Sequence, residues 1–267
     1  MLTEITPVVR QQGLGHDYYL LTLHAPEIAR TVQPGQFVHL RVPGMESGIL
    51  RRPFSVFKAE HDELTLLYRV IGQGTNAMRR LQPGEEVNLL GPLGHGFPPI
   101  EQDKFPVLIA GGYGAAALYL AAARAARRGM ICMGASTATD ILCSRDFQDL
   151  DWEVRLATED GTAGTRGLVT EVLDQWLAQR PENCIPEFLA CGPNGMLRAV
   201  SRRAQAGGWR AWVSLDRHMG CGMGACLACV QKVRKPKPDG SEEWQWVRLC
   251  TEGPVFESRD IIWDEND

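Results

Sequence analysis

The sequence predicts an antiparallel β-barrel (residues 1–100), an α/β domain (101–215) and a small C-terminal lobe (216–267). Short strand-like segments punctuated by turns fill the first part, and strands alternate with helices from about residue 104. Four of the eight cysteines crowd the C-terminal part. A chain of 267 residues suffices for about two domains of roughly 150 residues each.

Six segments of the first part have strand character, and two of them follow Pro-Gly turns at Pro34-Gly35 and Pro83-Gly84. Many short strands separated by turns are typical of a small barrel or sandwich. One short helix, Thr75 to Leu81, fits between the last two strands. The strand-like segments are 5–9, 18–23, 35–42, 53–57, 63–70 and 87–90.

The second part begins with an apolar strand, 105–110, which leads into a glycine turn and an alanine-rich helix, 115–128, ended by Gly129. Strands alternating with helices indicate βαβ units and a parallel sheet. The further strands are expected at 130–135, 152–158, 187–191 and 209–214, with helices at 168–177 and 194–206.

Composition excludes several classes of protein. The net charge is −4 and the basic residues are scattered, which argues against a nucleic-acid binder. No apolar run approaches the roughly 18 residues of a membrane span. The N-terminus lacks the basic and apolar regions of a secretory signal, so we expect a cytoplasmic protein with reduced thiols. In that compartment, crowded cysteines indicate metal or cluster ligands.

The cysteine segment carries the most specific motif. Cys221, Cys226 and Cys229 follow the spacing C-x4-C-x2-C, and Cys250 comes later, as in plant-type [2Fe–2S] sites. Glycines and alanines between them let backbone N–H groups approach the sulfurs. A structural zinc site is the alternative, although only one C-x2-C pair is present. The other four cysteines are expected to be small buried residues, and 234–243 an exposed hairpin loop.

Two short motifs in the barrel region suit a flavin dinucleotide. Arg52-Pro53-Phe54-Ser55 places a guanidinium, an aromatic ring and a hydroxyl at the start of a strand. Gly72-Gln73-Gly74-Thr75 precedes the short helix, whose N-terminus is a second anion site. A guanidinium held in place can bind a pyrophosphate through paired hydrogen bonds. The alternative is a chance string and an ordinary turn.

Three segments of the α/β part lie at the carboxyl ends of strands, where nucleotides bind in open sheets. Gly111, Gly112 and Gly114 join a strand to a helix but lack the full G-x-G-x-x-G pattern. The segment 158–162 follows the third strand, and its alternative is a tight connection. Cys191-Gly192-Pro193 closes the next strand, and its alternative is a helix start with proline in the first turn.

These motifs, in this order, resemble the ferredoxin–NADP reductase superfamily with an iron–sulfur tail. The segments 218–229 and 250–256, the latter reading Cys-Thr-Glu-Gly-Pro-Val-Phe, are similar to those of the electron-transfer subunits of two-subunit (type B) dihydroorotate dehydrogenases. The resemblance covers nearly the whole chain. It implies a ferredoxin-reductase-like module with an FAD-binding barrel, a nicotinamide-binding α/β domain and a cluster-binding lobe.

The resemblance also implies a function. A catalytic subunit carrying FMN oxidises dihydroorotate in pyrimidine (UMP) biosynthesis, and two copies of each subunit form a heterotetramer. Electrons pass singly through the [2Fe–2S] cluster to FAD, which delivers hydride to NAD+. A flavin belongs between the cluster and the nicotinamide because it can transfer either one or two electrons at a time. By resemblance, Arg52 lies toward a phosphate of FAD and Ser55 lies near the reactive edge of the flavin ring. The resemblance also places Arg69, Val70 and Ile71 along the flavin and Gly74 and Thr75 at the pyrophosphate. It places Cys191, Gly192 and Pro193 near the nicotinamide.

One departure and two rival functions accompany this interpretation. The family usually has a glycine triplet and a later proline where this chain has Tyr113 and Ala117, which predicts a crowded nicotinamide pocket. The rivals are a reductase subunit of a sulfite reductase, hydrogenase or ferredoxin-linked complex, and a zinc-stabilised binding module that is not an enzyme. No acid–base or nucleophile set stands out, and the six histidines are expected on the surface or in packing. Proton abstraction from dihydroorotate is then the partner's task.

Overall fold

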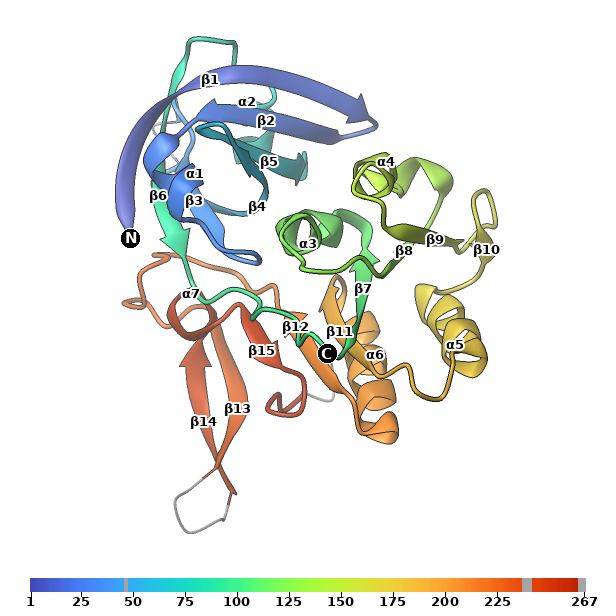
Figure 1. Cartoon of the computed structure of the whole chain (residues 1–267). Helices are drawn as coiled ribbons and strands as arrows, with labels where there is room; N and C mark the ends of the chain where they lie inside the picture. The colour runs from blue at the N-terminus through green and yellow to red at the C-terminus, as the bar shows by residue number, and fades with distance from the viewer. Residues whose placement is uncertain (46–47, 237–241, 264–267) are drawn as a thin grey trace.

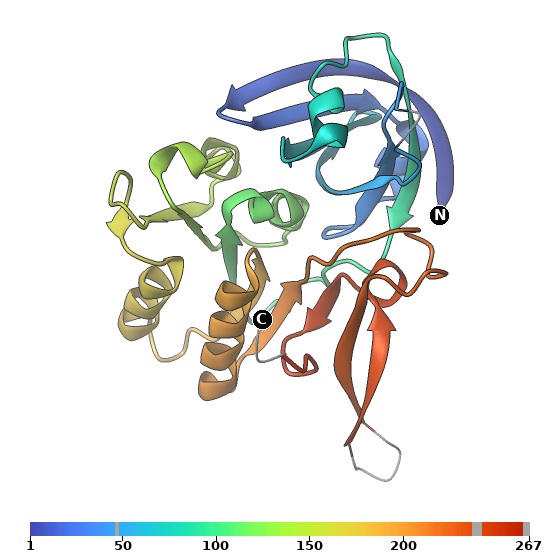
Figure 2. The same ribbon diagram turned by 180° about the vertical axis from the view of Figure 1, so that it is seen from behind.

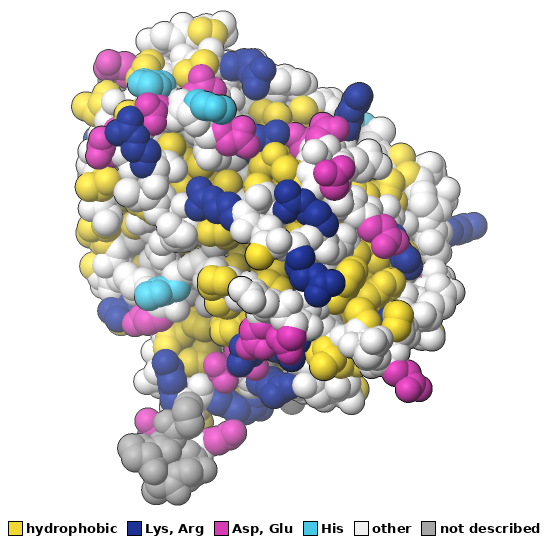
Figure 3. All heavy atoms as spheres, viewed as in Figure 1, with side chains coloured by type: hydrophobic (Ala, Val, Ile, Leu, Met, Phe, Trp, Pro, Cys, Tyr) yellow, Lys and Arg dark blue, Asp and Glu magenta, His cyan; other side chains and the backbone are white. Residues whose placement is uncertain are grey.

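A computed structural model describes residues 1–45, 48–236 and 242–263 and divides into a barrel, a sheet flanked by helices, and a hairpin lobe (Figures 1 and 2). Among these residues, no helix is long and apolar enough to cross a membrane. On the face shown in Figure 3, Lys and Arg side chains are interspersed with Asp and Glu and form no single basic patch.

The barrel is closed, and all six predicted strands are present in the order β1-β2-β5-β4-β3-β6. Its inside is filled by alternate side chains such as Val38, Leu40, Leu64 and Leu66, all fully buried. The strands are β1 (Leu2–Gly15), β2 (Tyr18–His24), β3 (Phe37–Arg41), β4 (Arg52–Glu60), β5 (Glu63–Arg69) and β6 (Glu86–Leu93), with helices α1 (Pro26–Thr31) and α2 (Gln73–Met78). Helix α1 was not predicted from the sequence, and α2 begins two residues earlier than expected.

The second part is a seven-stranded sheet in the order β10-β9-β8-β7-β11-β12-β15. The six strands from β10 to β12 are parallel, as predicted, and only β15 is antiparallel. The strands are β7 (Phe105–Gly111), β8 (Met130–Ala135), β9 (Glu153–Thr158), β10 (Thr165–Arg166), β11 (Pro186–Cys191), β12 (Arg210–Ser214) and β15 (Val255–Glu257).

The helices flanking the sheet differ from the predicted ones at one clear point. Helix α3 ends at Ala123 instead of residue 128, and the Arg124 side chain beyond it donates a hydrogen bond to the Val32 carbonyl of the barrel at 2.8 Å. The other elements here are the 3-10 turns η1 (Gly112–Gly114) and η2 (Ala138–Asp140) and helices α4 (Ser144–Gln148), α5 (Val169–Gln179) and α6 (Asn194–Gly207).

The C-terminal lobe is a two-stranded hairpin, β13 (Val230–Pro236) and β14 (Glu242–Arg248), followed by α7 (Leu249–Glu252). Both strands extend into 234–243, which the sequence predicted to be loop, because the chain keeps its cross-strand pairing as far as Pro236 opposite Glu242. Residues 237–241 lie outside the described part. After α7 the chain returns to the sheet, where β15 pairs with β12.

One hydrophobic core joins all three parts. It contains Phe37 and Leu93 from the barrel, Phe188 from the sheet, and Leu249 and Cys250 from the lobe, each less than 5% exposed. On the other side of the barrel, Lys58 Nζ lies 2.5 Å from Asp146 Oδ1 of α4. The barrel and the sheet are therefore fixed to each other both through the lobe and directly.

The junction of barrel and lobe leaves no room for a side chain at Gly94. This glycine has a φ of +72°, and a Cβ there would lie 2.4 Å from the Gly253 carbonyl oxygen. Gly84 has a φ of +90° with nothing within 4 Å of a Cβ, so it is a matched control. We expect Gly94→Ala to lower the Tm of the holoprotein by roughly 5–10 °C and Gly84→Ala by roughly 2–4 °C. Equal Tm values for the two variants would contradict this packing.

Candidate redox centre between the barrel and the lobe

The segment 216–229 has no helix or strand and is the orange loop in Figures 1 and 2. Its backbone wraps around the Cys221 sulfur. Gly222 and Gly224 have φ angles of +71° and +84°, which favour glycine. The wrap directs the N–H groups of Met223, Ala225 and Cys226 at Cys221 Sγ, at 3.4, 3.3 and 3.4 Å. Such donors stabilise a thiolate and tune a cluster's potential.

The electrostatics of the two ends of the motif differ. Burial raises the pKa of Cys221, but the three N–H donors and Cys226 more than offset this, bringing the pKa down to about 6. Burial and the neighbouring Cys229 raise the pKa of Cys250 to about 12. Cys221 is therefore ready to ligate as a thiolate, whereas Cys250 needs a metal to take its proton's place.

The four predicted ligands meet as two pairs of sulfurs. Cys221 is in hydrogen-bonding contact with Cys226, and Cys229 is in such contact with Cys250. Among the described residues, no three Cys, His, Asp or Glu side chains converge as one metal ion would require. Two sulfur pairs suit two irons, each with two cysteine ligands, better than they suit a single zinc ion.

Small residues leave space at this site. A Cβ on Gly220 would lie 3.2 Å from Cys226 Sγ, and one on Gly224 would lie 2.9 Å from the Thr251 side chain. The residues present therefore fit a small cluster held close to the backbone.

A clamp that the sequence analysis missed orients Cys250. The Arg248 guanidinium forms a 2.5 Å ion pair with Glu252 and donates to the Gly224 carbonyl at 3.1 Å. Thr251 adds a 2.6 Å hydrogen bond to Glu252. The hydrogen bond from Arg248 is the main reason that the pKa of Glu252 falls to about 2. The clamp ties α7, which carries Cys250, to the loop that carries the other ligands.

His39 is a second residue near the cluster loop that the sequence did not single out. It is fully buried on β3, which agrees with the expectation that the histidines lie on the surface or in the packing of the protein. Burial, followed by the charge of Arg51, lowers the pKa of His39 to about 4, so the ring is neutral at physiological pH. Its ring lies 2.7 Å from where a Cβ on Gly222 would be.

The predicted flavin residues gather at the start of β4 and α2. A Cβ on Gly74 would lie 3.0 Å from Arg52 Nε and 3.3 Å from Arg52 Nη2, so the guanidinium rests against the first turn of α2. The N–H groups of that turn have no partner within the helix. Gly74 therefore allows the Arg52 guanidinium to lie against the backbone at the start of α2.

The Thr75 hydroxyl is engaged within its own turn. It accepts hydrogen bonds from the Ile71 and Gly72 N–H groups at 2.9 and 3.2 Å. The hydroxyl therefore shapes the turn that begins α2.

The other flavin candidates lie on β4, at the end of β5 and in the turn that follows β5. The Phe54 ring packs edge-on against Tyr68 at 5.9 Å, and the Arg69 guanidinium lies 5.3 Å from the centre of the Tyr18 ring. Val70 is half-buried and Ile71 is 82% exposed, so both leave apolar surface for a ring. Pro53 and Ser55 pair with His39 and Phe37 across β4 and β3.

The two predicted nucleotide turns lie side by side, because β7 and β11 are neighbours. A Cβ on Gly111 would lie 2.6 Å from Pro193 Cδ, and one on Gly114 would lie 2.2 Å from the Cys191 carbonyl oxygen. Gly192 also approaches Gly111 to 2.9 Å by the same measure, and Gly112 has a φ of +53°. Tyr113 is 51% exposed at the rim of this turn. Helix α6 begins at Asn194, as expected, and Pro193 is its N-cap residue, one position before the first turn.

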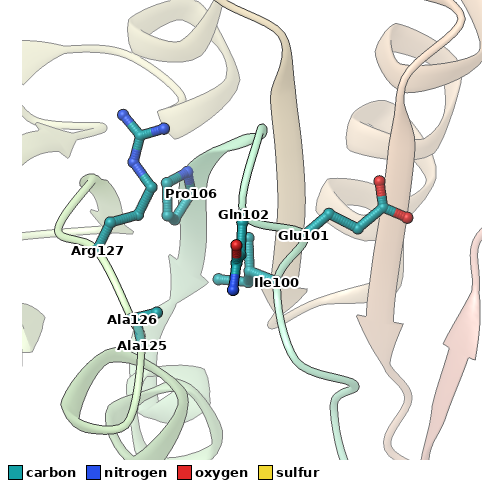
Figure 4. Close-up of a pocket in the computed structure, with 7 residues that line it drawn as sticks. All are labelled: Ile100, Glu101, Gln102, Pro106, Ala125, Ala126 and Arg127. Atoms are coloured by element: carbon teal, nitrogen blue, oxygen red, sulfur yellow. The ribbon is translucent and has the colours of Figure 1, made fainter.

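A separate hollow lies away from these residues, between the barrel–sheet connection and the end of α3 (Figure 4). It is lined by Ile100, Glu101, Gln102, Pro106, Ala125, Ala126 and Arg127. The Glu101 side chain points away from the Arg127 side chain, and the Glu101 carboxylate forms a 2.5 Å ion pair with Arg210. The hollow contains none of the predicted cofactor residues.

Comparison with known proteins places these sites in a family. Residues 216–262 match the model of the iron–sulfur cluster binding domain of dihydroorotate dehydrogenase B, and residues 6–97 match the oxidoreductase FAD-binding domain. The dihydroorotate dehydrogenase B (NAD(+)), electron transfer subunit of Bacillus mycoides (strain KBAB4) is 36% identical over 96% of both chains. The chain belongs to this family. The same identity and coverage hold for the subunit of Bacillus anthracis (strain CDC 684 / NRRL 3495).

Solved structures confirm the predicted ferredoxin-reductase-like fold. A chain of the NADH-dependent reduced ferredoxin-NADP oxidoreductase has a TM-score of 0.82 and 26% identity, covering 97% of this chain and 90% of that one. The ferredoxin NADP+ reductase of Neisseria gonorrhoeae, solved with FAD and NADP, shares the fold with a TM-score of 0.63 and 16% identity over 76% of this chain and 91% of that one.

The matches also decide between the alternatives left open by the sequence. FAD and an iron–sulfur cluster are confirmed as cofactors, and the zinc-stabilised binding module is excluded.

The contact between Gly74 and Arg52 makes a prediction about flavin binding. We expect Gly74→Ala to push the guanidinium aside and weaken FAD binding about tenfold, which is about 1.4 kcal/mol. Gly195, in the first turn of α6 with nothing within 4 Å of a Cβ, supplies the control Gly195→Ala. FAD fluorescence titration of the flavin-stripped chains measures both. Unchanged affinity in Gly74→Ala would exclude a role for this contact in flavin binding.

Proposed function

We propose that this chain transfers electrons to NAD+ in pyrimidine biosynthesis. The electrons come from a catalytic subunit that oxidises dihydroorotate. The observation that supports this most is the adjacency of its two redox sites. The cluster loop packs on β3 through Gly222 and His39, and β3 pairs directly with β4, the strand of Arg52 and Ser55. When bound, the cluster transfers single electrons and the flavin combines them into a hydride for the nicotinamide.

The chain's own residues have defined tasks in this proposal. Arg52 and the backbone at Gly74 and Thr75 hold the FAD pyrophosphate, and Ser55 lies at the reactive ring edge. Pro53, Phe54, Arg69, Val70 and Ile71 flank the flavin; Gly111, Gly112, Gly114, Cys191, Gly192 and Pro193 receive the nicotinamide nucleotide; and Cys221, Cys226, Cys229 and Cys250 ligate the [2Fe–2S] cluster. We assign residues 1–100 to FAD, 101–215 to the nucleotide and 216–267 to the cluster.

The partner proposed for this chain is an FMN-containing catalytic subunit, in a heterotetramer with two copies of each chain in the cytoplasm. Large apolar side chains are exposed around the cluster loop: Met223 (52%), Leu227 (61%) and Trp246 (56%). An open hollow lined by Leu227, Val230, Trp246 and Arg248 lies among them. Exposed apolar surface of this kind is typical of protein interfaces, and here it adjoins the exposed ligand Cys226.

The division of labour between the subunits is testable with the isolated chain. We expect anaerobic NADH to bleach its flavin absorbance and artificial acceptors to support NADH oxidation, because the nucleotide and flavin sites lie on one chain. We expect no turnover of dihydroorotate until the catalytic subunit is added. Flavin that stays oxidised with NADH, or dihydroorotate turnover by the pure chain, would contradict the proposal.

The same reconstitution tests the docking surface. Leu227→Asp places a charge on the exposed apolar patch, whereas Leu168→Asp places one on a similarly exposed leucine (56%) at the start of α5. If only Leu227→Asp loses complex formation, the result supports docking of the catalytic subunit on this apolar patch. Equal behaviour of the two variants would exclude it.

A ferredoxin-linked reductase is the second candidate function, because the NADH-dependent reduced ferredoxin-NADP oxidoreductase resembles this chain over nearly its full length. The mass of the chain that co-purifies from the native host separates the two candidates. A chain of another class than a dihydroorotate-oxidising subunit would favour the second.

A further inference from the structure

His39 is a buried polar side chain without a hydrogen-bond partner. It is 0% exposed, and within the described ranges neither Nδ1 nor Nε2 has a partner. Leaving a buried donor or acceptor unpaired costs free energy, so such a group calls for a bound partner. An apolar residue would fill the same space without this cost, so packing alone does not explain a histidine at this position.

The orientation of β3 decides what His39 faces. Val38 and Leu40 belong to the core inside the barrel, whereas Phe37 belongs to the core shared with Cys229 and Cys250. Because side chains alternate along a strand, His39 is on the same side as Phe37, toward the lobe. The two rings lie 5.7 Å apart.

The part of the lobe that His39 meets is the cluster loop itself. The Cε1 and Nδ1 atoms of the ring are both 2.7 Å from the Cβ position of Gly222, the residue that follows Cys221. The glycine is therefore needed for the ring to approach the loop. The charged Arg51 side chain does not bond to the ring, since its guanidinium donates to the Asn88 backbone and side chain at 2.9 and 2.5 Å and to the His39 backbone carbonyl at 3.5 Å.

The strand that carries the flavin motif lies beside β3. His39 pairs with Pro53 and Phe37 pairs with Ser55 across the β3–β4 ladder. The strand that brings the imidazole to the cluster loop is therefore hydrogen-bonded to the strand of Arg52 and Ser55.

We propose that His39 donates a ring N–H hydrogen bond to a sulfur of the iron–sulfur cluster on its Cys221 side, and thereby raises the reduction potential of the cluster. A neutral imidazole has one N–H donor, and cluster sulfurs are acceptors whose hydrogen bonds set the potential. The added electron makes the cluster more negative, so the hydrogen bond stabilises the reduced form more than the oxidised form. The proposal requires the cluster of this family but no particular electron donor.

A spectroscopic experiment on the intact holoprotein detects this bond directly. The chain is labelled with 15N-histidine, its cluster is reduced anaerobically, and pulsed EPR records weak nitrogen couplings to the cluster spin. We expect a histidine 15N coupling in the natural sequence and none in His39→Leu. The variant His24→Leu, which removes an exposed histidine on β2, keeps the coupling. Absence of a histidine coupling in the labelled natural protein would overturn the proposal even if His39→Leu fails to fold.

The potential provides the second readout. In an EPR-monitored redox titration, His39→Leu shifts the reduction equilibrium of the cluster about tenfold toward the oxidised form, which is about 59 mV for one electron. His39→Gln keeps an N–H donor, so its cluster potential returns most of the way to that of the natural protein. Phe37→Leu changes only the neighbouring packing and leaves the potential near its original value. An unchanged cluster potential in His39→Leu at full iron and sulfide content, or a shift confined to the flavin, would contradict the proposal. Bleaching of the flavin by NADH is scored separately, so failure here is distinct from failure of the proposed function.

Discussion

Burial of the Cys229–Cys250 pair in the shared hydrophobic core is the constraint on which the architecture depends. The segment that carries three of the four proposed ligands has no helix or strand of its own. Cys229 and Cys250 are 3% and 2% exposed and belong to one core with residues of the barrel and the sheet. The half of the site formed by Cys221 and Cys226 can remain on the surface, near a partner, because the other half is fixed.

The same division explains the electrostatics. Backbone N–H groups stabilise the Cys221 thiolate at the exposed end, whereas at the buried end Cys250 would lose its proton to a bound iron. The Arg248–Glu252 ion pair joins the two ends by tying α7 to the Gly224 carbonyl. Binding of the cluster is therefore coupled to the packing of the lobe against the barrel.

Local motifs could be predicted from the sequence because spacing and residue type determine them. The C-x4-C-x2-C segment, the glycine turn after β7 and the Arg52–Ser55 string are each short stretches of chain that can be identified from the sequence itself. The return of β15 to the sheet, the short α3, the Arg248 clamp and the orphaned imidazole of His39 could not be predicted. Each depends on contacts between residues far apart in the sequence, such as Arg124 with Val32 or His39 with Gly222.

EPR spectroscopy of the anaerobically purified full chain, with iron and acid-labile sulfide analysis, tests whether the four cysteines hold a paired-iron cluster. We expect two irons and two sulfides per chain and, after one-electron reduction, the spin-one-half signal of a coupled iron pair. Zinc in place of iron, or the signal of a four-iron cluster, would contradict this expectation.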